Sequence, residues 1–190
     1  MAWAVQLLAL FASRRHAALL PMAFLLAGFM LLVSRLAQMD PAITPTLPIL
    51  DTPWLAIHVS VVMVSYALFS FTFACSVAAL FTRRGDEAAL SRLRRLSLLM
   101  LHPALLTLTL GIFTGSAWAD GSWGHYWSWD PKETWALVPL AAYAPAVHAA
   151  SLPWMRRPAF FHAYVAAAFA VLLVTYFGVN YFFGGLHSYA

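Results

Sequence analysis

Long runs of apolar residues, separated by short polar segments, are the feature that most limits what this chain can fold into. The 190 residues are 63% hydrophobic and only 9% charged, and the mean hydropathy is +0.77. Soluble domains carry about 25% charged residues. The composition therefore excludes a soluble globular enzyme, a disordered chain and a nucleic-acid-binding module. It indicates a protein whose partner is the lipid bilayer.

The apolar runs are long enough to cross a membrane as helices, which takes about 20 residues. We predict an all-α polytopic transmembrane helical bundle of about five spans. The spans are Ala17–Val33, Trp54–Phe81, Leu96–Trp118, Trp135–Leu152 and Ala159–Phe183. A polar turn and a short amphipathic helix, which ends at Arg95, lead into the third span. The sequence contains no internal repeat and no soluble domain.

The positions of the basic residues predict the orientation of the bundle. All of them except Arg35 and Lys132 precede the first span or lie in alternate loops: Arg14, Arg15, Arg83, Arg84, Arg92, Arg94, Arg95, Arg156 and Arg157. Cytoplasmic loops of membrane proteins carry an excess of Lys and Arg. The N-terminus is therefore predicted to be cytoplasmic. The loop Ala119–Thr134 and the C-terminus are predicted to lie on the outer, periplasmic or lumenal, side.

The chain divides into two predicted regions. Residues 1–53 form an N-terminal segment with one transmembrane helix and an outer loop rich in proline, and residues 54–190 form the main membrane domain. Within that domain, Gly111 and Gly115 have the GxxxG spacing, which permits close packing of two helices. Cys75 is the single cysteine, so no internal disulfide is possible.

The predicted outer loop between the third and fourth spans is unusually rich in tryptophan. Five of the eight tryptophans lie between positions 118 and 135: Trp118, Trp123, Trp127, Trp129 and Trp135. An aromatic belt at the membrane interface explains one or two per helix end. A dense, rigid aromatic surface instead suits a large flat apolar ligand, such as a porphyrin or a quinone.

The tetrapeptide that starts at Asp130 has the pattern of a helix start. Asp130 is a good N-cap, Pro131 suits the first helical position, and Glu133 stands where a capping box places its glutamate. We therefore expect the fourth helix to begin here. A catalytic acid–base role for Asp130 and Glu133 is the alternative.

The seven histidines fall into two predicted layers. His58, His125 and His187 belong to the outer side, and the inner side holds His16, His102, His148 and His162. Two neutral imidazoles flanking a porphyrin iron form a common ligand pair, and His58 and His187 converge on the face of the tryptophan loop. His148 fits either a ligand of a second, deeper haem or a hydrogen bond to a neighbouring helix.

Three segments carry a resemblance to a known family. They are WGHYWSWDPKETWAL from Trp123, LAIHVSVVMVSYA from Leu55 and GVNYFFGGLHSY from Gly178. The chain resembles the tryptophan-rich "WWD" haem-handling family of cytochrome c assembly proteins. The ending DPKETW favours the CcsA (ResC) branch of the system II pathway of cytochrome c biogenesis.

The resemblance implies a role in haem transport. Family members carry haem b to the outer membrane face and present it there for attachment to apocytochrome c. His58 and His187 match the two outer histidines that bind haem iron, and His148 matches an embedded histidine that holds haem in passage. The residues that match the porphyrin-cradling loop are Trp123, Gly124, Tyr126, Trp127, Trp129 and Asp130. None of these residues is catalytic by this reading.

The resemblance also implies a partner and a location. A CcsB (ResB)-like membrane protein accompanies this branch, and the chain would be at most part of a holocytochrome c synthase with it. The location is the bacterial inner (cytoplasmic) membrane or the thylakoid. Residues 54–190 would be the cytochrome c assembly (WWD) domain. Two departures are the short N-terminal region and His125, where no histidine is expected.

Two alternative functions remain for a chain with this resemblance. A HemX-like membrane protein shares the tryptophan-rich loop but regulates haem synthesis. A haem-bearing structural subunit of a membrane redox complex would use the haem for electron transfer.

Overall fold

The computed structural model describes residues 50–82 and 85–183, together with positions 6, 7, 10, 20, 21, 24, 27, 28 and 31. The side chains of Asn180 and Tyr181 are not among the described features. The predicted first span and the proline-rich loop lie largely outside these residues. So do His16 and His187.

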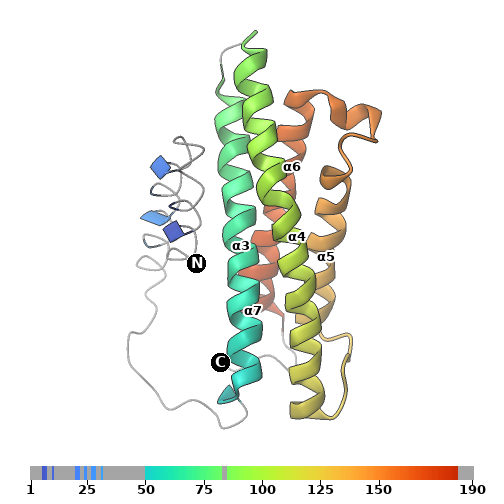
Figure 1. Cartoon of the computed structure of the whole chain (residues 1–190). Helices are drawn as coiled ribbons and strands as arrows, with labels where there is room; N and C mark the ends of the chain where they lie inside the picture. Colours follow the sequence, from blue (N-terminus) through green and yellow to red (C-terminus); the bar gives the residue numbers. More distant parts are fainter. Residues whose placement is uncertain are drawn as a thin grey trace.

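Helices make up the described part of the chain, which contains no strand (Figure 1). The all-α prediction is therefore confirmed for these residues. The elements in chain order are α3 (Pro53–Leu80), α4 (Glu87–Trp123), α5 (Pro131–Val147), the 3-10 turn η2 (Pro153–Arg156), α6 (Pro158–Leu173), the π-helical turn η3 (Val174–Gly178) and α7 (Val179–Phe182).

Three described helices are long and apolar enough to cross a membrane: Pro53–Leu80, Glu87–Trp123 and Pro158–Gly178. They correspond to the predicted second, third and fifth spans, and the chain is an integral membrane protein. Helix α5 has only 17 residues and ends at Val147, five residues before the predicted end of the fourth span. The chain turns there, with the backbone N–H groups of Ser151 and Leu152 donating to the His148 carbonyl.

Helix α4 is continuous over 37 residues. The predicted amphipathic segment and the third span are thus one helix. Asp86 caps its start by accepting from the Ala89 N–H at 2.9 Å. Its other end stops at Gly124, which has φ 78° and donates its N–H to the Asp120 carbonyl. A left-handed residue of this kind commonly ends a helix, and glycine adopts it without steric cost.

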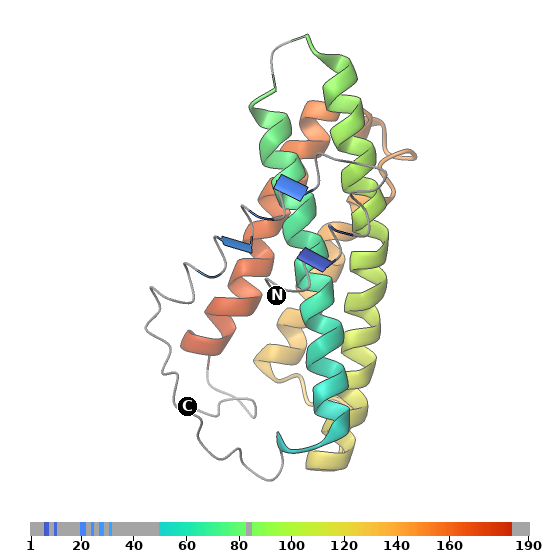
Figure 2. The ribbon, with the colours of Figure 1, turned by 60° about the vertical axis from the view of Figure 1, so that its left-hand side comes forward.

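The glycines of the GxxxG pattern pack α4 against α3, as predicted. A Cβ on Gly111 would lie 2.6 Å from Val62 Cγ2, and a Cβ on Gly115 would lie 2.7 Å from His58 Cε1. Farther along the pair, Ser65 Oγ donates to the Ala104 carbonyl at 2.8 Å. The two helices therefore approach closely along much of their length (Figure 2).

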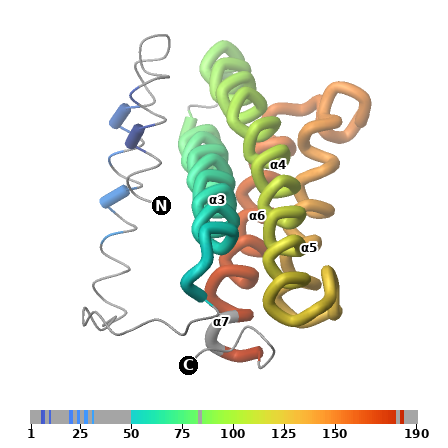
Figure 3. Tube along the Cα trace, turned by 60° about the horizontal axis from the view of Figure 1, so that its bottom comes forward, coloured from blue at the N-terminus to red at the C-terminus, as the bar shows by residue number. Residues whose placement is uncertain are grey.

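Aromatic side chains fill the space between the four long helices, which Figure 3 shows grouped around a common axis. Phe69 of α3 stacks on Tyr143 of α5 with ring centroids 4.3 Å apart. Phe73 of α3 stacks on Phe169 of α6 at the same separation of 4.3 Å. The Tyr164 hydroxyl of α6 adds a 2.7 Å hydrogen bond to the Ala142 carbonyl of α5.

Arg94 joins α4 to the connection between α5 and α6 at the predicted cytoplasmic end of the bundle. Its guanidinium donates to the Arg156 carbonyl at 2.7 Å and to the Ala149 carbonyl at 3.5 Å. The same group lies 5.2 Å from the centre of the Phe161 ring. Arg94 therefore ties α4 to the connection between α5 and α6, where backbone carbonyls outside helices need donors.

Replacing Gly111 with alanine tests the close approach of α3 and α4. The added methyl group must displace the stiff Val62 side chain, so Gly111→Ala is expected to lower the stability of the fold by about 1–3 kcal/mol. Thermal unfolding in detergent measures the change. Gly121→Ala, on the same helix with open space around the new Cβ, is the control and is expected to be neutral or stabilising by up to about 1 kcal/mol.

Equal loss of stability in the two variants would contradict this account of the α3–α4 contact.

Candidate functional site: an aromatic-walled cavity at the tryptophan loop

His58 lies on α3, in the second turn of the helix, and is half-buried against α4. Its Nδ1 is 2.8 Å from the Gly111 carbonyl oxygen. Because a carbonyl only accepts hydrogen bonds, Nδ1 carries the ring proton and Nε2 has the lone pair. The absence of a side chain on Gly115 leaves room for the ring. The two glycines of α4 therefore fix both the orientation and the tautomer of His58.

A cavity of about 390 Å³ opens beside His58. Ligand sites in proteins usually measure about 300–1,000 Å³ and are mostly apolar with a few polar groups. This cavity has that character. Its polar lining comes from His58, Tyr66, Ser116, Trp118, Trp127, Lys132, Glu133, Thr175 and Tyr176, which belong to α3, α4, α5, η3 and the tryptophan loop.

Glu133 holds the loop between α4 and α5 in shape. Its Oε2 accepts from the Ser128 N–H at 2.7 Å, from the Ser128 hydroxyl at 3.1 Å and from the Asp130 N–H at 3.2 Å. Asp130 in turn caps α5 by accepting from the Lys132 N–H at 3.0 Å. The predicted capping box is present, with Pro131 in the first turn. The Glu133 carboxylate thus takes part in capping α5 and also orders the loop before it.

Trp129 lies between Ser128 and Asp130, the two residues whose N–H groups donate to Glu133, and has an unusual backbone conformation. Its φ is 60°, the one left-handed value at a non-glycine residue in the described chain. Its carbonyl accepts from the Thr134 hydroxyl at 3.2 Å. Such a conformation costs about 1–3 kcal/mol and persists where neighbouring contacts enforce it. The Trp129 side chain is 71% exposed.

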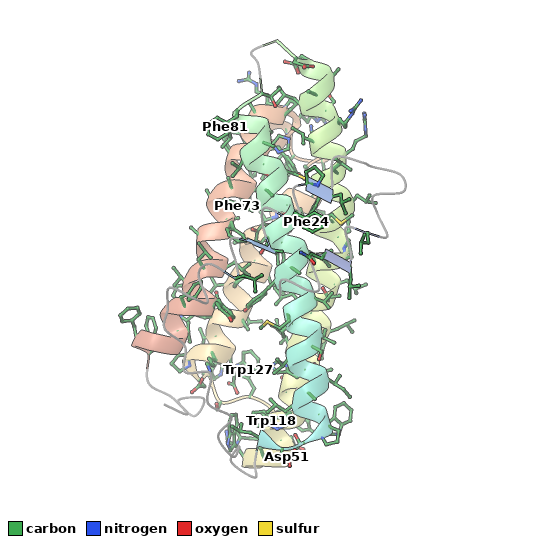
Figure 4. The ribbon with its side chains drawn as sticks, turned by 90° about the vertical axis from the view of Figure 1, so that its left-hand side faces the viewer. Phe24, Asp51, Phe73, Phe81, Trp118 and Trp127 are labelled. Carbon is green, nitrogen blue, oxygen red and sulfur yellow. The ribbon has the colours of Figure 1, made fainter. Side chains whose placement is uncertain are left out.

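The tryptophans form two edge-to-face pairs. Trp127, in the cavity wall, meets Trp129 with ring centroids 5.8 Å apart. Trp118, also in the wall, meets Trp123 at 4.9 Å. Figure 4 shows Trp118 and Trp127 at the end of the bundle where α3 begins, opposite the end that carries Phe81. The loop therefore presents one aromatic surface to the cavity and another outward.

Charged and phenolic groups near the loop are electrostatically coupled. Partial burial lowers the pKa of Lys132, and the neighbouring Asp130 carboxylate opposes that shift. The Asp120 carboxylate raises the pKa of the exposed Tyr126 phenol by accepting its hydrogen bond. A cation at the cavity wall next to an aromatic surface is suited to a ligand that has both a flat apolar body and a carboxylate.

The π-helical turn η3 was not predicted from the sequence. Thr175 donates to the Trp135 carbonyl at 3.2 Å and to the Val171 carbonyl at 2.9 Å. Trp135 is four residues before Pro139, which has no N–H to donate, so its carbonyl needs a donor from outside α5. Tyr176 of the same turn meets Tyr66 at 5.9 Å in the cavity wall. In the sequence, Pro139 is the residue that indicates that the Trp135 carbonyl needs a hydrogen-bond donor from outside α5.

Among the described residues, the other histidines do not line this cavity. His148 caps the far end of α5, about 25 Å from Asp130 along the helix axis. It is exposed, and its Nδ1 is 2.9 Å from the Ala144 carbonyl of its own helix, not of a neighbouring one. His125 is an exposed loop residue with Nδ1 2.9 Å from the Trp123 carbonyl. Among the described residues, no three His, Cys, Asp or Glu side chains cluster as a metal site.

The fold and the site together define a class: a polytopic helical membrane protein whose described part has an aromatic-walled cavity lined by His58 and a capped tryptophan loop at one end. A profile of the cytochrome c assembly protein family matches residues 1–187. The chain belongs to this family, and its curated relatives place it with the CcsA proteins.

Three relatives give the extent of the similarity. Protein NrfI of Wolinella succinogenes is 35% identical over 197 residues, which cover 100% of this chain and 22% of that protein. The cytochrome c biogenesis protein CcsA of Parasynechococcus marenigrum is 37% identical over 179 residues, 76% of this chain and 58% of the relative. CcsA of Prochlorococcus marinus is 35% identical over 233 residues, 100% of this chain and 72% of the relative. The chain thus spans about a fifth of NrfI and somewhat over half of the first CcsA protein.

Replacing Glu133 tests whether its carboxylate orders the tryptophan loop. A hydrogen bond to a charged group contributes about 1.5–3 kcal/mol, and Glu133→Ala removes three such bonds. We expect the tryptophan fluorescence to shift to longer wavelength and the near-ultraviolet circular dichroism to weaken, while the helix content stays the same.

Glu87→Ala, at the exposed start of α4, is the control and should leave both signals unchanged. Unaltered spectra for Glu133→Ala would show that the loop holds its shape without this carboxylate.

Proposed function

We propose that this chain binds haem b at the outer membrane face and presents it for covalent attachment to apocytochrome c. Membership of the cytochrome c assembly family supports a role in cytochrome c biogenesis. Two of the relatives described above are named for that process. Haem is the cargo in this proposal, and the cavity beside His58 is the place where it is held.

The hydrogen bond between His58 and Gly111 is the observation that carries the proposal. Histidines that bind metals nearly always donate their other ring N–H to a carbonyl or carboxylate, which fixes the ring and raises its basicity. His58 has this arrangement in the wall of a cavity faced by Trp127. Its Nε2 is therefore prepared as a ligand to iron.

The chain contributes positioning in this mechanism. His58 binds iron on one side, and His187, which lies outside the described residues, supplies the second imidazole by its match to the family motif. Trp123, Trp127 and Trp129 orient the flat macrocycle so that its vinyl groups face outward. Lys132 offers a cation for a propionate carboxylate. The apocytochrome histidine displaces one imidazole while its thiols approach the vinyl groups, so no nucleophile from this chain is needed.

The remaining loop residues support this arrangement without touching iron. Asp130 caps α5, and Gly124 ends α4 with a left-handed residue, so that both helices stop where the loop must turn. Tyr126 is held by the Asp120 carboxylate on the exposed side of the loop. Together they keep the tryptophans at the mouth of the cavity.

His148 is proposed to hold haem at a second, inner position during its passage. Its Nδ1 donates to the Ala144 carbonyl, so Nε2 has the lone pair, as in His58. The two histidines lie toward opposite ends of the bundle. A CcsB-like membrane protein is the proposed companion that supplies the opposing ligand there, in a bacterial inner or thylakoid membrane with the N-terminus in the cytoplasm.

The visible spectrum of the purified protein tests the proposal. We expect a low-spin spectrum of haem bound by two histidines, which His58→Ala and His187→Ala each weaken and added imidazole restores. His125→Ala removes another histidine of the same outer layer and should leave the spectrum unchanged, because His125 is an exposed loop residue outside the cavity lining.

A haem spectrum that neither His58→Ala nor His187→Ala alters would contradict binding at the outer face. No bound haem, even with the companion protein co-expressed, would contradict the haem-handling function.

A further inference from the structure

The Gly111 carbonyl, which orients His58, is shared by several donors. His58 Nδ1 lies 2.8 Å from its oxygen, and the Thr114 hydroxyl lies 3.0 Å from the same oxygen. Gly111 is inside the continuous helix α4, so the backbone ladder also directs the Gly115 N–H at this carbonyl. A carbonyl oxygen has two lone pairs. Three donors therefore converge on two acceptor positions, and they cannot all bind at full strength.

Thr114 is the donor that can leave this carbonyl. Its hydroxyl has a single proton, and the Leu110 carbonyl lies at the same distance of 3.0 Å. Rotation of the O–H bond moves the proton from one carbonyl to the other, whereas the Gly115 N–H is fixed by the helical backbone. The described lining of the cavity does not include Thr114. Thr114 can therefore act on a ligand in the cavity through His58.

We infer that Thr114 is a positioning residue of the candidate site: by sharing the Gly111 carbonyl it weakens the hydrogen bond of His58 and so lowers the donor strength of Nε2 toward iron. A strong hydrogen bond from the other ring N–H makes a histidine ligand more basic. Hydrogen bonding around the axial ligand is also one of the means by which proteins set the potential of haem. The inference rests on the proposed function, since it takes haem iron to be what His58 binds.

A ligand of moderated strength suits a site that releases its cargo. In the mechanism proposed above, the incoming apocytochrome histidine displaces one imidazole. Sharing the carbonyl lowers the donor strength of His58 while the ring stays oriented by Gly111. Orientation and ease of release are thus set by the same carbonyl.

The same arrangement recurs seven residues earlier on α4, with a serine in place of the histidine. Ser65 of α3 donates to the Ala104 carbonyl at 2.8 Å. The Thr107 hydroxyl lies 3.1 Å from that carbonyl and 2.7 Å from the Pro103 carbonyl. An effect on helix packing alone would therefore appear at both threonines, whereas an effect on an iron ligand would appear at Thr114 alone.

The reduction potential of bound haem tests the inference. Thr114→Val keeps the shape of the side chain and removes the hydroxyl, so the Gly111 carbonyl accepts more fully from His58. Loss of an outer-shell partner changes metal affinity by about 10–100-fold, and removal of a competitor should change it less. We expect the ratio of ferric to ferrous haem affinity to rise about 3-fold, which lowers the potential by about 28 mV at about 59 mV per tenfold change.

Two variants serve as controls for this measurement. Thr114→Ser keeps the hydroxyl and should retain the wild-type potential. Thr107→Val removes a hydroxyl with the matching pair of carbonyls on the same helix, and it should leave the potential unchanged.

The hydrogen bond itself is measured in the haem-free protein by proton NMR. In protein made with isotope-labelled histidine, the Nδ1 proton of His58 is assigned by its absence in His58→Ala. A stronger hydrogen bond moves such a proton downfield. We expect this shift in Thr114→Val, and no shift in Thr107→Val.

Three outcomes would overturn the inference. They are a Thr114→Val variant that matches the wild type in the potential or in the Nδ1 proton, equal changes in Thr107→Val, and a rise in potential instead of a fall. The expected proton shift in a protein that binds no haem would count against the proposed function alone. Haem bound through His58 with a potential that Thr114→Val leaves unchanged would count against the role of Thr114 alone.

Discussion

The close contact between α3 and α4 is the constraint on which the candidate site depends. Helices in a membrane gain little from burying apolar surface, so they associate through van der Waals contact at small residues. Gly111 and Gly115 provide that contact, and His58 occupies the same interface. The backbone of one helix therefore orients the imidazole of the other. A Cβ at Gly111 would press on Val62, and a Cβ at Gly115 would press on the His58 ring, so a larger residue at either position would disturb this helix contact.

The Glu133 carboxylate fixes the shape of the tryptophan loop, as the two glycines fix the packing of α3 and α4. Glu133 gathers three donors from the segment before α5, and Asp130 caps that helix. With both ends of the segment fixed, Trp129 is held at φ 60° and its side chain points to the outside. The loop that carries the tryptophans is therefore ordered by polar contacts, while Trp129 itself stays exposed.

The sequence predicted the features that depend on local patterns. The helices at Trp54–Phe81 and Leu96–Trp118, the capping box at Asp130 and the GxxxG contact all follow from runs and spacings of a few residues, and the structure confirms them. The bond from His58 to Gly111 joins residues 53 positions apart and has no local signature. The π-helical turn and the early end of α5 depend on packing between helices. The assignment of haem ligands remains a prediction, and His187 lies outside the described residues.

The bond from Thr175 to Trp135 has a mechanical consequence. Pro139 leaves a gap in the backbone ladder of α5, and a hydroxyl from the turn after α6 fills it. The first turns of α5 are thus anchored to the end of α6. That end leads directly into the segment that contains His187, while α5 carries the capped loop. A shift at the start of α5 would strain its bond to the turn after α6, so these two parts of the cavity wall are mechanically linked.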